Sequence, residues 1–177
     1  MTNINKKIII IGGDPYSINS EIIFKSWKKL KKTTKKKIYV IANYSLIKKQ
    51  FNELNYKIKI IKIKKINEIS KGNELKIINV DLKFTNPFKV KREDASQYVI
   101  NCLNLAHKLA LRKNISGMIN CAINKDLLIT KKIGVTEFLA SKCNIKDNSE
   151  VMLITNQKFS VCPITTHIDL KDVSRNI

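Results

Sequence analysis

Apolar and polar residues alternate along this chain with two periods, one typical of buried strands and one typical of amphipathic helices. Residues 6–11 form a short, β-branched apolar run that ends at Gly12 and Gly13, which predicts a buried strand. Residues 20–30 carry apolar side chains at helical spacing with lysines on the other face, which predicts a helix. The pattern continues with a strand at 37–42, a helix at 45–54 and a strand at 57–64. This β-α-β-α-β order predicts a parallel sheet with right-handed crossovers.

The rest of the chain predicts further elements of the same kind. They are a strand at 75–80, the longest helix at 93–113, a strand at 116–122, a helix entered at Gly134, and strands at 151–155 and 159–164. No repeat, low-complexity tract or linker divides the sequence, so we expect residues 1–177 to form a single α/β unit. The predicted fold class is α/β, with three α/β/α layers around a mostly parallel sheet.

Length and composition support a protein with a core of its own. The chain has 177 residues, 44% of them hydrophobic, which is enough to build such a core. No stretch resembles a secretory signal, and none reaches the roughly eighteen apolar residues of a membrane span. We therefore expect a soluble cytoplasmic protein. Its four cysteines lack metal-site spacing, so they are interpreted as reduced thiols rather than a zinc finger.

The net charge of +20 raises the question of a nucleic-acid partner. Almost all of the positive charge is lysine, and only three arginines are present to make bidentate contacts with bases. The lysine runs are not interleaved with aromatic residues, as single-strand binding surfaces are. Isoleucine and asparagine are abundant as well. This indicates a bias of the whole composition toward Ile, Lys and Asn rather than selection for a basic binding groove. A nucleic-acid-binding module is therefore the less favoured interpretation, although an anionic small substrate would benefit from the field.

Two histidines and one threonine are the candidates for chemistry. His167 follows an apolar run and precedes a predicted helix, a position where open α/β sheets collect ligands and metals. His107 lies beside the apolar stripe of the longest helix and is interpreted as a solvated or rim residue. Thr136, taken alone, is interpreted as a helix N-cap. A buried, hydrogen-bonded histidine is the commoner case, so residue type alone leaves the role of His167 open.

Four motifs in order resemble the amino-terminal half of the 4-hydroxythreonine-4-phosphate dehydrogenase family. They are Gly13-Asp14-Pro15, residues 120–125 (Asn-Cys-Ala-Ile-Asn-Lys), residues 134–140 (Gly-Val-Thr-Glu-Phe-Leu-Ala) and residues 165–173 (Thr-Thr-His-Ile-Asp-Leu-Lys-Asp-Val). Each motif alone is a weak signal, but the four together span nearly the whole chain. The resemblance implies a truncated form of the architecture found in isocitrate and isopropylmalate dehydrogenases.

The resemblance also implies an activity. Members of this family use NAD or NADP and a divalent metal (Zn, Mg or Co) to oxidise 4-phosphohydroxy-L-threonine to 2-amino-3-oxo-4-phosphohydroxybutanoate. This product loses carbon dioxide to give 3-amino-2-oxopropyl phosphate on the way to pyridoxal phosphate. The metal holds the hydroxyl and carboxylate groups and stabilises the developing alkoxide. At matching positions, His167 would be a metal ligand and Thr136 a substrate contact. A homodimer with its site between subunits is implied as well.

The chain departs from the family pattern at three points. Val135 stands where the family has a histidine, so another hydroxy acid is an alternative substrate for a related metal-dependent decarboxylating dehydrogenase. The family prefers Ala-Gly-Ile-Gly-Pro-Glu after Asp-Pro, whereas residues 16–21 read Tyr-Ser-Ile-Asn-Ser-Glu. Family members are also nearly twice as long and carry their other metal ligands and most of the nucleotide site in the remaining half. We therefore expect a fragment or split gene product that is inactive alone.

Overall fold

The computed structural model describes residues 6–66, 73–128, 134–143, 151–165 and 169–175. The chain groups into two compact units, residues 1–135 and 136–177, and each unit is described by itself. The prediction of a single unit over residues 1–177 concerns the domain organisation of the whole protein and stays a prediction.

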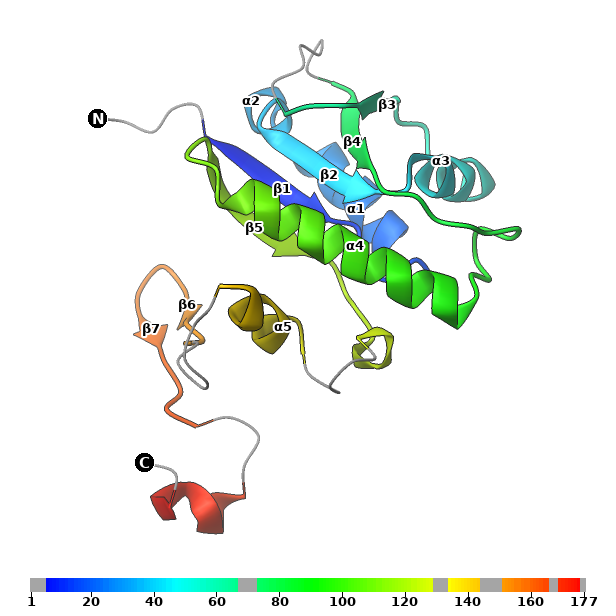
Figure 1. The fold of residues 1–177 in the computed structure, drawn as a ribbon. Coiled ribbons are helices and arrows are strands. Elements are labelled where there is room, and N and C mark those ends of the chain that lie inside the picture. Colours follow the sequence, from blue (N-terminus) through cyan, green and yellow to red (C-terminus); the bar gives the residue numbers. More distant parts are fainter. Residues whose placement is uncertain (1–5, 67–72, 129–133, 144–150, 166–168, 176–177) are drawn as a thin grey trace. The chain divides into compact units, whose positions relative to one another are not determined.

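The first unit is built on a five-stranded parallel sheet with the order β3-β4-β2-β1-β5 (Figure 1). Its strands are β1 (Lys7–Ile11), β2 (Ile38–Ala42), β3 (Ile60–Ile63), β4 (Leu75–Asn79) and β5 (Ile115–Asn120). The central strand β2 is buried at all five positions, as expected for a parallel strand covered on both faces. The α/β fold class and the parallel sheet predicted from the sequence are confirmed.

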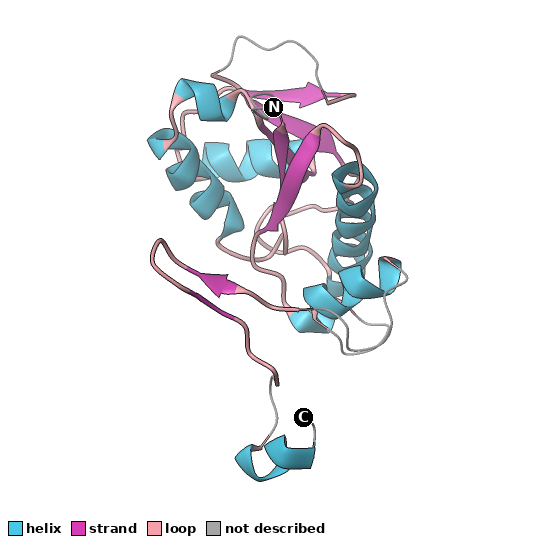
Figure 2. Cartoon of the chain, turned by 90° about the vertical axis from the view of Figure 1, so that its left-hand side faces the viewer, coloured by secondary structure: helices cyan, strands magenta, loops and turns pink. Residues whose placement is uncertain are grey.

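Helices cover both faces of this sheet (Figure 2). They are α1 (Asn19–Lys29), α2 (Lys32–Lys35), α3 (Tyr44–Glu53) and α4 (Arg92–Ala110). Helices α1 and α3 pack on one face, where Trp27 and Phe51 join the buried cluster around Val40 and Ile77. Helix α4 packs against β1, β2 and β5 on the other face. The apolar faces predicted for the long helices are thus the faces that form the core.

The second unit contains short elements. Helix α5 (Val135–Lys142) leads into it, the strands β6 (Ile154–Thr155) and β7 (Ser160–Val161) pair in antiparallel fashion, and η2 (Leu170–Arg175) is a 3-10 helix. The sequence predicted longer strands at 151–155 and 159–164, so both strands are shorter than expected. In the first unit, the helix α2 was not predicted, because its four residues, Lys-Thr-Thr-Lys, carry no apolar period.

Candidate functional site

The loops that follow β1 and β5 meet at the carboxyl edge of the sheet. The Cys121 N–H donates to the Ile11 carbonyl at 3.0 Å, and the Asp14 N–H donates to the Ala122 carbonyl at 3.0 Å. Strand β1 connects to β2 on one side while β5 lies on its other side, so the strand order reverses between β1 and β5. Open α/β sheets bind ligands outside the carboxyl ends of their strands at such a reversal. We therefore place the candidate functional site at this edge.

Gly13 allows the two loops to approach closely. Its φ angle of 73° lies in the left-handed region that favours glycine. A Cβ atom at this position would lie 2.5 Å from the Ala122 carbonyl oxygen and 2.6 Å from Asn19 Nδ2. Any side chain here would push the loop after β1 away from the loop after β5. The double glycine therefore serves a close backbone approach at the edge of the sheet.

The contact between the loop after β1 and the loop after β5 is called the joint below. A cavity of about 270 Å³ lies beside it, at the start of α4. Its polar lining comes from Asp14, Tyr16, Arg92, Asn124 and Asp126. The Asp14 carboxylate accepts a hydrogen bond from the Tyr16 N–H at 2.7 Å, which folds the loop after β1. The cavity thus draws its walls from the two loops and from the first turn of the longest helix.

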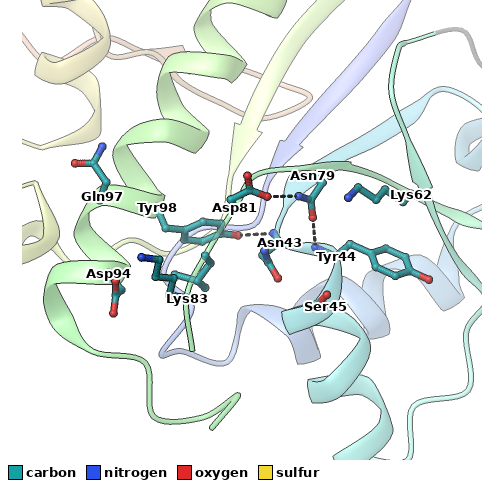
Figure 3. A pocket seen from close by; sticks show the side chains of 11 residues that line it. Asn43, Tyr44, Ser45, Lys62, Asn79, Asp81, Lys83, Asp94, Gln97 and Tyr98 are labelled. Atoms are coloured by element: carbon teal, nitrogen blue, oxygen red, sulfur yellow. Dashed lines mark hydrogen bonds between the residues drawn. The ribbon is translucent and has the colours of Figure 1, made fainter. Parts of the chain in front are cut away.

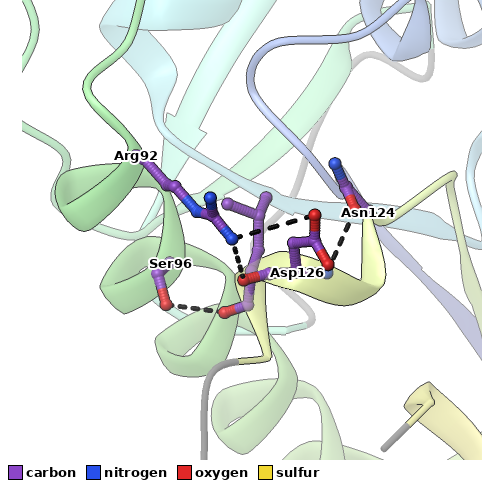
Figure 4. Close-up of polar contacts among 5 residues, drawn as sticks. Arg92, Ser96, Asn124 and Asp126 are labelled. Carbon is purple, nitrogen blue, oxygen red and sulfur yellow. Dashed lines mark hydrogen bonds and ion pairs between the residues drawn. The ribbon is translucent and has the colours of Figure 1, made fainter. Parts of the chain in front are cut away.

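The short 3-10 helix η1 (Lys125–Leu127) is held against α4 by polar contacts (Figure 4). Arg92 Nη2 lies 3.3 Å from the Asp126 carbonyl oxygen and 3.8 Å from Asp126 Oδ2. Buried Ser96 donates to the Leu127 carbonyl at 2.6 Å, and Asn124 Oδ1 accepts from the Asp126 N–H at 3.0 Å. The side chains of Arg92 and Asp126 are largely exposed, so the buried Ser96 contact holds η1 more firmly than the ion pair.

A larger cavity of about 560 Å³ lies at the carboxyl ends of β2 and β4, against α4 (Figure 3). Two lysines, Lys62 and Lys83, and two aspartates, Asp81 and Asp94, balance its charge. The Tyr98 hydroxyl accepts from the Asn43 N–H at 3.0 Å. Burial raises the pKa of Tyr98 well above its usual value, so the group is a neutral hydroxyl at physiological pH.

Gln50 ties the edge of the sheet together from α3. It is 3% exposed, and its Nε2 donates to the Pro15 carbonyl at 3.1 Å and to the Pro87 carbonyl at 2.8 Å. Both prolines lie in loops at the carboxyl edge, one after β1 and one before α4. A buried amide with two carbonyl partners satisfies its own donors and fixes both loops. The edge is therefore a preorganised surface.

Burial favours the protonated thiol at two cysteines of the first unit, Cys102 and Cys121. Burial raises the pKa of Cys102 to about 12 and that of Cys121 to about 11. A thiolate is the nucleophilic and metal-binding form, so burial disfavours the reactive form of both groups. All four cysteines are free, in agreement with the interpretation as reduced thiols.

The residues that the sequence singled out are described here within their own elements. Thr136 is the second residue of α5 and is exposed, so it does not cap the helix as its residue type alone predicted. Val135, the first residue of α5, is half-buried. His107 is half-buried in the last turn of α4. His167 lies outside the described residues.

Within the described ranges, no group of three or more His, Cys, Asp or Glu side chains is placed to hold a metal ion. In the same part of the chain, no helix is long and apolar enough to cross a membrane.

The family model of the pyridoxal phosphate biosynthetic protein PdxA matches residues 34–177. This chain belongs to the PdxA family. Its PdxA relatives include the 4-hydroxythreonine-4-phosphate dehydrogenases of Aquifex aeolicus, 34% identical over 96% of this chain, and of Sulfurihydrogenibium sp., 30% identical over 97% of it. The chain spans 52% of each of these two proteins, or about half their length.

Solved structures of other 4-hydroxythreonine-4-phosphate dehydrogenases have the same fold as this chain. A 4-hydroxythreonine-4-phosphate dehydrogenase from Klebsiella pneumoniae superposes with a TM-score of 0.80 and 26% identity, covering 94% of this chain and 53% of that protein. One from Burkholderia phymatum gives a TM-score of 0.81 at 21% identity, covering 96% of this chain and 52% of that protein. The α/β architecture of this chain is thus that of the PdxA family.

Sequence reasoning missed the amide side chains that organise the edge. Gln50 and Asn43 look like ordinary polar positions on a helix and at its start, and only the fold shows that they reach neighbouring loops. For Asn19 a signal existed, because asparagine stands where the PdxA motif quoted above has glycine. In the structure, the Asn19 side chain turns toward Ala122 and donates to its carbonyl.

Proposed function

We propose that this chain forms one half of an NAD(P)-dependent oxidoreductase that oxidises 4-phosphohydroxy-L-threonine during pyridoxal phosphate synthesis. The observation that carries the proposal is the PdxA family match over residues 34–177, together with relatives named 4-hydroxythreonine-4-phosphate dehydrogenase. In this reaction the secondary alcohol becomes a ketone as hydride passes to NAD or NADP. The β-keto acid 2-amino-3-oxo-4-phosphohydroxybutanoate then loses carbon dioxide to give 3-amino-2-oxopropyl phosphate.

Thr136 is the proposed substrate contact of this chain. Its exposure in the first turn of α5 leaves the hydroxyl accessible to a ligand. The first-turn N–H groups of a helix also favour an anionic group such as a phosphate. Val135, in place of the family histidine, presents no hydrogen-bond donor. The site of this chain therefore depends more on Thr136 than a site with both polar groups would.

His167 is the proposed metal ligand of this chain. The described residues bring together no set of three metal ligands, so we derive no catalytic step through a metal from this structure. A catalytic metal of this kind commonly takes three protein ligands, and the chain contains only two histidines. The remaining ligands would come from the other half of the enzyme, and the 177 residues alone would then bind metal weakly and turn over nothing. A homodimer and a cytoplasmic location complete the proposal.

A fusion protein tests this function. The 177 residues are joined to the part of the Aquifex aeolicus relative that follows the matched segment, and reduction of NAD or NADP is followed by absorbance. Candidate substrates are 4-phosphohydroxy-L-threonine and unphosphorylated 2- and 3-hydroxy acids, each with and without a divalent metal. Circular dichroism confirms that the fusion is folded before activity is compared.

The proposal predicts metal-dependent reduction of the nucleotide with the phosphorylated substrate. A folded fusion that prefers an unphosphorylated acid would support the alternative dehydrogenase that Val135 suggests. A folded fusion with no activity on any of these acids would contradict both readings.

A further inference from the structure

The Asn19 side chain lies inside the joint between the loops after β1 and β5. It is 3% exposed although it opens a helix at the surface of the sheet. Its Nδ2 donates to the Ala122 carbonyl at 2.7 Å and to the Asp14 carbonyl at 3.3 Å. Its Oδ1 accepts from the Ala122 N–H at 3.2 Å. One amide side chain therefore binds both backbone groups of Ala122, much as a neighbouring strand would.

The orientation of this amide is fixed by its partners. Two carbonyl oxygens face Nδ2 and one N–H group faces Oδ1. The reverse orientation would place an oxygen against two carbonyl oxygens, leaving buried polar groups unpaired. The link is thus specific for a side chain that carries a donor and an acceptor side by side.

Both loops held by Asn19 contribute to the cavity of about 270 Å³. Asp14, whose carbonyl accepts from Asn19, is one of the residues that line the cavity. Two residues beyond Ala122, Asn124 lines the same cavity and caps η1 through the Asp126 N–H. A movement of either loop would therefore displace polar groups of the candidate site.

A glycine at position 19 could not form this link, because it has no side chain. Gly13 and Asn19 are also matched to each other, since a Cβ on Gly13 would lie 2.6 Å from Asn19 Nδ2. The missing side chain at residue 13 makes room for the amide at residue 19. The contact between the two loops therefore needs both residues, glycine at position 13 and asparagine at position 19.

We propose that Asn19 is a positioning residue of the candidate site, which locks the loop after β1 to the loop after β5. It acts through the backbones of Asp14 and Ala122. The inference concerns the geometry of this edge and holds whichever hydroxy acid the whole protein oxidises. A failure of the test below would leave the proposed function standing.

Amide hydrogen exchange of the ¹⁵N-labelled chain tests the proposal by NMR, with the variants N19A and N19G. We expect the Ala122 N–H to exchange about tenfold faster in both variants, the effect of losing one net hydrogen bond and opening the joint. In the unchanged protein, the side-chain NH₂ protons of Asn19 should exchange slowly, because both have carbonyl partners. A residue that merely fills space would not protect its own side-chain protons.

The variant N43A is the matched control. Asn43 is another buried amide that binds a loop carbonyl, that of Val80, at 2.9 Å. Its loss should destabilise the protein while the ratio of Ala122 exchange to that of the β2 core amides stays unchanged. Equal protection of Ala122 in N19A, N19G and the unchanged protein would overturn the proposal. So would an acceleration at Ala122 that is matched by all core amides.

Discussion

Gly13 is the residue at which backbone geometry decides whether the site forms. Its φ of 73° is a conformation that residues with side chains rarely adopt, and a Cβ here would lie only 2.5 Å from the Ala122 carbonyl oxygen. We expect Gly13→Ala to lower the free energy of unfolding by about 2–4 kcal/mol through backbone strain and the clash. Urea denaturation measures the loss. Gly117→Ala is the control, because a Cβ there meets nothing within 4 Å.

Lys76 is a buried lysine, and its surroundings disfavour the charged form of its side chain. It is 2% exposed, its Nζ donates to the Lys36 carbonyl at 2.6 Å, and it lies 4.1 Å from the centroid of the Tyr39 ring. Burial, and to a lesser degree the charge of Lys7, lowers the pKa of Lys76 from 10.5 to about 8, although Glu74 acts in the opposite direction. Between these two pH values the unfolded chain binds a proton that the native chain has released.

The contribution of Lys76 to the free energy of unfolding should therefore rise as pH increases from about 8 to 10.5. Below this window both states are protonated, and the folded state bears the penalty of a buried charge. Urea denaturation across the window should show a positive slope that is smaller in K76M. The exposed Lys48 provides the control variant K48M, which should keep the slope. An equal slope in K76M and the unchanged protein would contradict this account.

Helix α3 begins at a residue that links two elements. Asn43 accepts from the Leu46 N–H at 2.9 Å as the N-cap, and it donates to the Val80 carbonyl after β4. We expect Asn43→Ala to lower the free energy of unfolding by about 1–3 kcal/mol, since it removes a cap and leaves a buried carbonyl unpaired. Thermal unfolding checks this, with the exposed Asn52→Ala in the same helix as control. A loss no greater than that of the control would show that the cap contributes nothing.

Element by element, the sequence predicted the long elements and missed what joins them. The apolar periods at residues 6–11, 20–30 and 93–113 have direct counterparts in β1, α1 and α4, because each element buries one continuous face. The pairing of β1 with β5 was not predictable, since it joins residues about a hundred positions apart. The contact of Asn19 with Ala122 depends on that pairing. The contacts of Gln50 depend on how the loops after β1 and before α4 fold, which no local pattern indicates.

At the scale of the whole molecule, membership of the PdxA family accounts for the fold, which the net charge does not. The fold matches solved structures over nearly the entire chain, whereas the net charge of +20 by itself identifies no partner. The four sequence motifs did not predict the sheet, the contact between the loops at Gly13, or the two cavities. The motifs instead pointed to Thr136 and His167, whose proposed roles involve the remaining half of the enzyme.

The proposed function assigns this chain a metal-binding imidazole, that of His167, and a substrate-binding hydroxyl, that of Thr136, within a dehydrogenase. The most direct measurement is metal-dependent NAD(P) reduction by the folded fusion protein, comparing His167→Ala with His107→Ala. The account predicts that activity falls at least a hundredfold, on the order of the loss of a metal ligand or its support, in the first variant and is retained in the second. Undiminished activity after His167→Ala would contradict it.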